Sequence, residues 1–378
     1  MLTERVEFVP EQDAELFAAA PAAPAVFMLR GADATAEPYV SKTANLRRRL
    51  QRLLGAPTEK SKRLNLRDRV RWIEHSATGS DFESAFLLYR VLRVEFPQTY
   101  AKRLRFRFAP LVKMHMENAY PRASVTTRLG RSADLSKYYG PFLSRVAAEK
   151  FMNDSLDFFK MRRCVDDLNP DPKFPGCIYS EMKMCLAPCF KGCTDDAYAT
   201  EVARVNAYFE SGGDSLVREI SSAREAASAD LQFEDAAAHH ARLEKLGSVV
   251  TSLPEIVRRL DQLHALIVQR SPAAETVNFF RVDAGSLAGP LPFAISAPDH
   301  TKTQSMEARV EEALSSLPPA VPKSAPERME HLAILKRWYY RSSRDGEIFI
   351  ADRKGELPMR RIVRGISRVY RGEKEVHS

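Results

Sequence analysis

Residues 25–50 read AVFMLRGADATAEPYVSKTANLRRRL, and this stretch decides the fold of the N-terminal part of the chain. The apolar run 25–30 and the run 38–42 are separated by a connection that contains Gly and Asp, which predicts a hairpin of two strands. Leucines recur at helical spacing in 45–54, so a helix is expected directly after the hairpin.

Two further elements complete the predicted N-terminal unit. A third strand is expected at 69–75, and a helix is expected at 81–96, with Asp81 as its N-cap. Residues 25–102 are therefore predicted to form a compact unit of order β-β-α-β-α. The preceding residues 1–24 are predicted to be an extension, with a short acidic helix followed by a linker rich in Pro and Ala.

The rest of the chain divides by pattern into three segments. Residues 103–194 are expected to hold two strands and then a helix that leads into a cysteine-rich stretch. Residues 195–270 have an almost purely helical period, and 271–378 return to an α+β pattern of unknown role. The predicted fold class is α+β, with a small mixed sheet and helix domain, a cysteine-rich metal-binding segment, a helical hairpin and a C-terminal α+β region.

Composition narrows the class of protein. The chain has 378 residues, of which 44% are hydrophobic, and this length allows two or three domains with cores of their own. The net charge of +8 favours anionic partners, among which nucleic acid is the usual one. The sequence contains no apolar run near the ~20 residues that would span a bilayer and no signal-peptide layout, so a cytoplasmic protein without a membrane partner is expected.

All five cysteines lie in one stretch of the chain. Cys164, Cys177, Cys185 and Cys189 are separated by twelve, seven and three residues, and Cys193 follows after three more. Thiols clustered in this way in a reducing compartment indicate metal ligation more than disulfides. Four thiolates suit a four-iron cluster or a structural zinc ion, and the wide spacing slightly favours iron–sulfur because zinc sites usually contain tighter pairs. Cys193 is left as an alternate ligand or a free thiol.

The N-terminal pattern resembles the GIY-YIG nuclease domain, in the form that opens UvrC. The resemblance implies that Tyr39, Lys42 and Arg49 lie beside a scissile phosphate, where cations stabilise the charge of the reaction. Two positions depart from the family pattern. Phe27 replaces the tyrosine of the first motif, and Tyr89 stands where the family has its metal-binding glutamate.

Without this glutamate, the site needs another carboxylate to bind the catalytic metal ion. Glu83 and Glu95 are each six residues from position 89, which turns them about 120° away from it around a helix. Because a tyrosine does not hold a hard divalent cation as a carboxylate does, a degenerate nuclease site is expected, and Mg²⁺ is expected only if the site is active. The retained cations are expected to bind DNA phosphates instead.

The cysteine region also resembles UvrC. It contains the sequence CLAPC at 185–189, and the sequence YYGPF lies upstream at 138–142. The resemblance implies an iron–sulfur cluster, 4Fe-4S in type, held by the first four cysteines, with zinc as the alternative. The aromatic residues of the upstream motif are expected to pack in a core rather than stack on bases.

Residues 214–252 are predicted to form a helical hairpin. The sequence LQFEDAA at 231–237 resembles the UVR motif, through which UvrC pairs with UvrB. This implies that Leu231, Phe233, Glu234 and Ala237 contact a UvrB-type helicase subunit, with Phe233 as the main anchor. The other interpretation is an ordinary amphipathic hairpin of the core.

The resemblance covers about residues 25–250, and full-length UvrC continues into an RNase-H-like nuclease and helix-hairpin-helix regions that this sequence lacks. The basic residues around Trp338 are interpreted as a helix end rather than a nucleic-acid patch. The hypothesis is a UvrC-like protein of nucleotide excision repair that binds DNA and UvrB. The alternatives are an active metal-dependent DNA endonuclease that incises near lesions, and a non-catalytic adaptor or competitor at UvrB that never contacts DNA.

Overall fold

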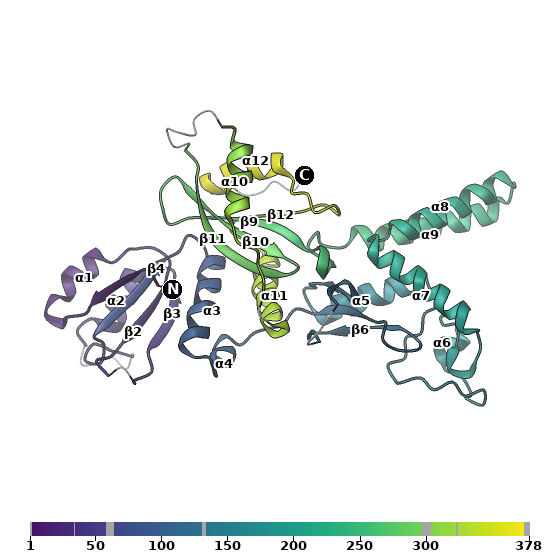
Figure 1. Ribbon diagram of the computed structural model, residues 1–378, viewed down its shortest axis with the longest axis horizontal. Helices are drawn as coiled ribbons and strands as arrows, with labels where there is room; N and C mark the ends of the chain where they lie inside the picture. The colour runs from purple at the N-terminus through teal and green to yellow at the C-terminus, as the bar shows by residue number, and fades with distance from the viewer. Residues whose placement is uncertain are drawn as a thin grey trace.

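A computed structural model of the chain describes residues 2–33, 35–57, 64–130, 134–296, 304–322 and 324–373. Within these residues the chain forms three four-stranded antiparallel sheets with helices packed around them (Figure 1). The predicted α+β class is therefore confirmed. None of the helices in the described ranges is both long and apolar enough to cross a membrane.

The first sheet contains the predicted hairpin and has the strand order β1-β4-β2-β3. Its strands are β1 (Glu4–Glu7), β2 (Ala25–Arg30), β3 (Tyr39–Thr43) and β4 (Trp72–Ala77), and its helices are α1 (Asp13–Ala19), α2 (Leu46–Leu54) and α3 (Asp81–Glu95). The four leucines of α2 are buried, as their spacing predicts. Ser80, rather than Asp81, is the N-cap of α3, because the Ser80 side chain accepts a hydrogen bond from the Glu83 backbone.

The residues expected to form an N-terminal extension belong to this first sheet. The expected short helix is present as α1, but it is preceded by the unexpected strand β1, which pairs antiparallel with β4 at the sheet edge. Phe8 and Phe17 then place buried side chains in the same core as α2 and β2. The strand was missed because all four of its residues are exposed, so it lacks the alternation of a half-buried strand.

The second sheet has the order β6-β5-β7-β8 and lies in the middle of the molecule. Its strands are β5 (Leu111–His115), β6 (Arg122–Thr126), β7 (Tyr138–Gly140) and β8 (Arg258–Arg259), and α5 (Arg145–Leu156) packs against it. The other helices of this part of the chain are α4 (Tyr100–Leu104), which contacts α3, and α6 (Ile178–Glu181) and α7 (Asp195–Glu210). The strand expected from residue 103 begins only at Leu111. Arg105 ends α4 in a left-handed conformation, with φ of 49°, and the residues that follow form a loop.

The predicted helical hairpin is present as α8 (Asp214–Ala229) and α9 (Phe233–Thr251). The two helices run side by side and project away from the body of the molecule (Figure 1). Leu216, Ile220 and Leu246 bury the base of the hairpin in the main core. Gly213, not the Asp214 side chain, occupies the N-cap position of α8.

The third sheet has the order β11-β10-β9-β12 and helices on both faces (Figure 1). Its elements are β9 (His264–Arg270), β10 (Thr276–Asp283), β11 (Ser286–Ala294), β12 (Glu347–Ile350), α10 (Met306–Ser316), α11 (Ala325–Tyr339) and α12 (Met359–Arg371). Alternate residues face opposite sides, so Leu266 and Val268 pack toward α10 and α12 while Ile267 packs toward α11. The expectation of a helical region up to residue 270 is wrong at β9. Its apolar residues form a continuous run without the alternation that identifies a half-buried strand.

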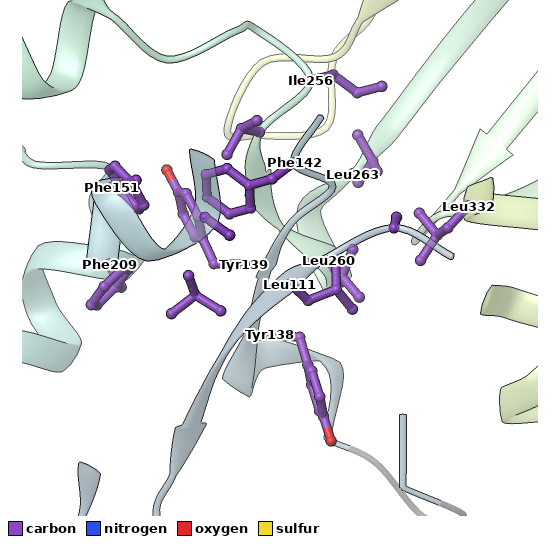
Figure 2. Close-up of a cluster of buried hydrophobic side chains, with 14 of the residues drawn as sticks. Leu111, Tyr138, Tyr139, Phe142, Phe151, Phe209, Ile256, Leu260, Leu263 and Leu332 are labelled. Atoms are coloured by element: carbon purple, nitrogen blue, oxygen red, sulfur yellow. The ribbon is translucent and has the colours of Figure 1, made fainter. Parts of the chain in front are cut away.

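The YYGPF motif lies in the core, as the sequence predicts. Tyr138, Tyr139 and Phe142 are all buried, and Tyr139 stacks on Phe151 with ring centroids 5.5 Å apart. Figure 2 shows these aromatic rings among leucines from the second sheet and from the residues that lead into the third. The motif therefore joins the middle of the molecule to the C-terminal sheet.

The N-terminal unit docks on the third sheet through the start of α3. A Cβ atom at Gly79 would lie 1.9 Å from the carbonyl oxygen of Arg270, so only glycine fits here. The buried carboxylate of Glu83 accepts hydrogen bonds from the Gly79 backbone at 2.9 Å and from Asn278 of β10 at 3.0 Å. This contact fixes α3 against the C-terminal part of the chain.

Candidate functional site

The residues of the predicted nuclease site form two groups. Arg49 donates a hydrogen bond to the Tyr39 hydroxyl, with 2.7 Å between the two atoms. Phe27 is fully buried in the core of the first sheet, and its ring centroid lies 6.1 Å from that of Tyr39. Lys42 instead forms an ion pair with Asp81 at the start of α3.

Asp81, which was predicted only as a helix cap, lies at the centre of a charged cluster. Its carboxylate pairs with Lys42 and also with Arg341, which follows α11. Burial alone would raise the pKa of Asp81, but the hydrogen bonds and charges of these two cations lower it below its usual value. The sequence offers no signal for the pairing with Arg341, because the two residues are 260 positions apart.

Tyr89 occupies the expected position on α3 but serves a contact between helices. Its side chain is 1% exposed, and its hydroxyl donates a hydrogen bond to Glu330 of α11 at 2.8 Å. The same hydroxyl accepts from Arg93 at 2.9 Å. Burial, followed by the charge of Glu330, raises the pKa of Tyr89, so the phenol stays neutral.

The glutamates of α3 are also engaged with protein groups. Glu83 bonds to Gly79 and Asn278, and its burial raises its pKa above the usual value. Glu95 forms an ion pair of 2.8 Å with Arg30 of β2. Throughout the described parts of the chain, no three side chains of the His, Cys, Asp or Glu type are arranged to hold a metal ion.

A groove of about 680 Å³ lies between α3, the loop after α4 and α11. Its cationic side chains are Lys42, Arg105, Arg107, Lys336, Arg337 and Arg341. Among the described residues that line it, Asp81 is the sole carboxylate. Arg105 and Arg107 were not predicted as site residues, although the alternation of Arg and Phe in RLRFRF at 103–108 is a signal for a cationic and aromatic surface.

The four cysteines expected to bind a metal line one small cavity. Cys164, Cys177, Cys185 and Cys189 come from separate turns of the segment between α5 and α7, and all are free thiols. Burial, together with the other thiols, raises the pKa of Cys185 to about 11. The cavity gathers the four side chains, although their positions do not reach the geometry of a metal site.

Polar groups also approach the sulfur atoms. The backbone amide of Ala187 donates to the Cys185 sulfur at 3.3 Å, and the Arg162 guanidinium donates to the Cys164 sulfur at 3.4 Å. Arg162 is only 2% exposed. Cys193 is not among the residues described around this cavity, and it packs against the main core instead.

The tip of the α8–α9 hairpin exposes two large apolar side chains. Leu231 is 71% exposed and Phe233 is 67% exposed, and Leu231 adopts a left-handed conformation with φ of 57°. Glu234 and Ala237, on the first turns of α9, are exposed as well. The four residues expected to bind a partner are therefore available on one end of the hairpin.

Comparison with known proteins gives consistent matches. Residues 109–208 match the family described as UvrC/Cho excinuclease, middle domain. The UvrABC system protein C of Rickettsia canadensis is 26% identical over 68% of this chain and 40% of its own length. The chain is thus similar to UvrC proteins over about two thirds of its length. The corresponding protein of Rickettsia felis is 25% identical over 71% of the chain and 41% of its own length.

The chain spans about two fifths of the length of the curated relatives it matches. No solved structure matches it.

Proposed function

We propose that this UvrC-like chain acts in nucleotide excision repair as a protein that binds DNA and a UvrB-type partner without cutting DNA. One observation carries the non-cutting part of the proposal. The position of the metal-binding glutamate holds a buried tyrosine, and the carboxylates of α3 are bonded to protein groups. Cleavage of a phosphodiester needs a metal ion or a comparable source of positive charge, together with an activated water.

The active endonuclease remains the competing function, and Asp81 is its best candidate for a metal ligand. Binding an ion there would require Asp81 to leave Lys42 and Arg341, two cations that already neutralise it. The second requirement is a further acid, and Tyr89 offers a neutral phenol at the position where the family has a glutamate. These contacts favour the non-cutting function.

Binding of DNA is supported by charge. The chain carries a net charge of +8, and six of its cationic side chains converge on the groove beside α3. Such a surface attracts the phosphate backbone and gives an affinity that falls steeply with salt. This observation favours DNA binding over a pure adaptor that contacts UvrB alone.

Docking on a UvrB-type partner is supported by the hairpin tip. Exposed Leu231 and Phe233 on a projecting pair of helices fit an anchor that is buried when a second hairpin packs against it. We expect Phe233→Ala to weaken association with purified UvrB at least about tenfold, because truncation of an aromatic anchor costs ~2 kcal/mol or more. Isothermal titration calorimetry measures the change.

Val217→Ala is the matched control for this titration. Val217 is an exposed apolar residue of α8, away from the tip. An unchanged affinity for UvrB is expected with this variant. Equal affinities of wild type and Phe233→Ala for UvrB would contradict the proposal that the hairpin docks on this partner.

A thiolate-bound metal centre is the proposed cofactor, and an iron–sulfur cluster is preferred over zinc. The chemistry of the donor set fits this group, because four thiols line one cavity and because an amide and a guanidinium donate to the sulfur atoms of Cys185 and Cys164. Such a centre would fasten the segment between α5 and α7 to the body of the protein. The cysteines would hold it, while Arg162 would offset the negative charge of the thiolates.

Protein purified without oxygen is expected to be brown, with broad visible absorbance and about four iron atoms per chain, as a four-iron cluster requires. Replacing Cys185 with Ser should abolish the colour, whereas Cys193→Ser should leave it unchanged, because Cys193 packs away from the cavity. A colourless protein that contains one zinc ion would contradict the iron–sulfur assignment.

A further inference from the structure

The groove between α3, the loop after α4 and α11 has a cationic side that the nuclease resemblance does not account for. Arg105 and Arg107 come from the loop, and Arg337 comes from the last turn of α11. All three are exposed, and within the described residues none of them forms an ion pair. They are therefore available to an anionic ligand.

The positive charge of this groove is poorly compensated by the protein itself. The groove sets six cationic side chains against one carboxylate, and Asp81 is already shared between Lys42 and Arg341. Burial and the neighbouring charge of Arg107 lower the pKa of Lys336, which donates to the Phe108 carbonyl at 3.4 Å. A bound anion would relieve this repulsion.

Part of the groove lining is apolar. Its side chains include Leu88, Leu104, Phe106, Leu143 and Ile334. Leu143 is 53% exposed, so its side chain is accessible to a ligand in the groove. Phe106 stacks on Phe108, with 5.8 Å between the ring centroids and 23° between the ring planes. Of these two rings, Phe106 lines the groove, and it lies between Arg105 and Arg107 in the sequence.

We propose that this groove binds an unpaired stretch of DNA, with phosphates on Arg105, Arg107 and Arg337 and a base against Phe106 and Leu143. The inference rests on the proposed function in one respect, namely that the chain acts on DNA. An unpaired strand fits better than a duplex, because a duplex keeps its base faces inside the stack and presents only charge to an apolar wall. Cationic grooves with aromatic platforms are the general way in which proteins hold single strands.

Fluorescence anisotropy tests the groove with the full chain. The probes are a fluorescein-labelled thymidine oligonucleotide and a duplex of the same length, each titrated over a range of salt concentrations. The groove variant is Arg105→Gln/Arg107→Gln/Arg337→Gln. The control variant is Arg128→Gln/Arg218→Gln/Arg364→Gln, which changes net charge equally at three exposed arginines outside the groove.

We expect the wild type to bind the single strand more tightly than the duplex. The groove variant should lose at least about tenfold in affinity for the single strand, and its salt slope should fall by about 2 because three phosphate contacts are lost. The control variant should stay within about threefold of wild type. A fourth protein, Leu143→Ser, should weaken single-strand binding with little change in the salt slope, since it removes an apolar contact and no charge.

Three results would overturn the inference. The first is an equal loss of affinity in the groove and control variants, and the second is a wild type that binds the duplex at least as tightly as the single strand. The third is a groove variant that binds like wild type. This result would show that the groove is not the binding site, while DNA binding elsewhere on the protein would still be possible. A wild type that binds neither probe would instead defeat the proposed DNA-binding function. Circular dichroism confirms that each variant is folded.

Discussion

The hydroxyl of Tyr89 lies between Glu330 and Arg93, to which it is hydrogen-bonded. Tyr89 therefore has a structural role of its own. It ties α3 to α11 where a carboxylate would repel Glu330 and the nearby Glu327. Tyr100 donates to the other oxygen of Glu330 at 2.8 Å, so the buried glutamate is held by two phenols. At Tyr89, α3 therefore packs against α11, which joins the N-terminal and C-terminal parts of the chain.

Tyr89→Phe should lower the free energy of unfolding by about 1–3 kcal/mol, because it leaves one oxygen of buried Glu330 without its hydrogen bond. Urea denaturation followed by circular dichroism measures the change. Tyr370→Phe is the matched control, since Tyr370 is 40% exposed, and it should change stability by less than about 0.5 kcal/mol. Equal stabilities of the two variants would show that the contact with Glu330 contributes nothing.

At the scale of single residues, the sequence indicates where a role is lost but not what replaces it. The resemblance to the nuclease family assigns Tyr89 to the metal position, and this assignment predicts a degenerate site. Glu330, the hydrogen-bond partner of Tyr89, is 241 residues away, and no local sequence pattern predicts that contact. Arg341 as a partner of Asp81 is hidden for the same reason.

At the scale of elements, α11 is the helix on which the two ends of the chain meet. His331 of α11 is buried, and its Nδ1 atom accepts a hydrogen bond from the Leu287 backbone of β11 at 3.1 Å. Its ring also packs edge-on against Tyr89 of α3, with centroids 5.4 Å apart. Burial lowers the pKa of His331 to about 4, and the neighbouring charges of Glu327, Arg93 and Arg328 modify it further.

Stability should therefore fall as the pH is lowered from 6.5 toward 4. The unfolded chain protonates His331 near the ordinary pKa of 6.5, whereas the folded chain resists protonation until about 4. Between these values the unfolded state binds more protons, so the contribution of His331 is complete above pH 6.5 and lost near pH 4. The shift corresponds to a contribution on the order of 3 kcal/mol.

Urea denaturation at several pH values, with His331→Asn as the variant, isolates this contribution. The asparagine side chain can still accept from Leu287 but does not titrate, so its stability should decline less than that of wild type over this range. His240→Asn, at an exposed position of α9, should follow wild type. Parallel curves for wild type and His331→Asn would contradict the assignment.

The elements that the sequence predicts well are those with a local period. The leucines of α2 and the apolar runs of β2 and β3 identify the first unit, and the period of α8 and α9 identifies the hairpin. β1 was missed because its pairing with β4 spans some seventy residues and its side chains are exposed. β9 was assigned to a helical region because a short continuous apolar run fits either element.

At the scale of the whole molecule, the predicted sites lie on different parts of one structure. The projecting hairpin extends to one side, and the N-terminal unit with α3 lies on the other (Figure 1). The cavity of the four cysteines lies in the segment before α7, which leads into the hairpin. This separation allows the protein to hold a partner and DNA at the same time, as the proposed function requires.

How these parts are arranged was not predictable from the sequence. The boundaries of the hairpin and of the cysteine cluster follow from spacing, but the docking of α3 on the third sheet depends on Gly79 and Glu83 meeting Arg270 and Asn278. The groove arises only from that docking, because its cations come from segments far apart in the chain. Patterns of local period carry no information about such contacts.

Incision of a lesion-bearing duplex tests the central claim most directly. The purified chain is incubated with the A and B proteins of the UvrABC system, Mg²⁺ or Mn²⁺ and an end-labelled duplex, with a UvrC known to cut as the positive control. The non-cutting account predicts no strand break above background on a denaturing gel, with either metal. Reproducible metal-dependent incision that disappears on Lys42→Ala would contradict it.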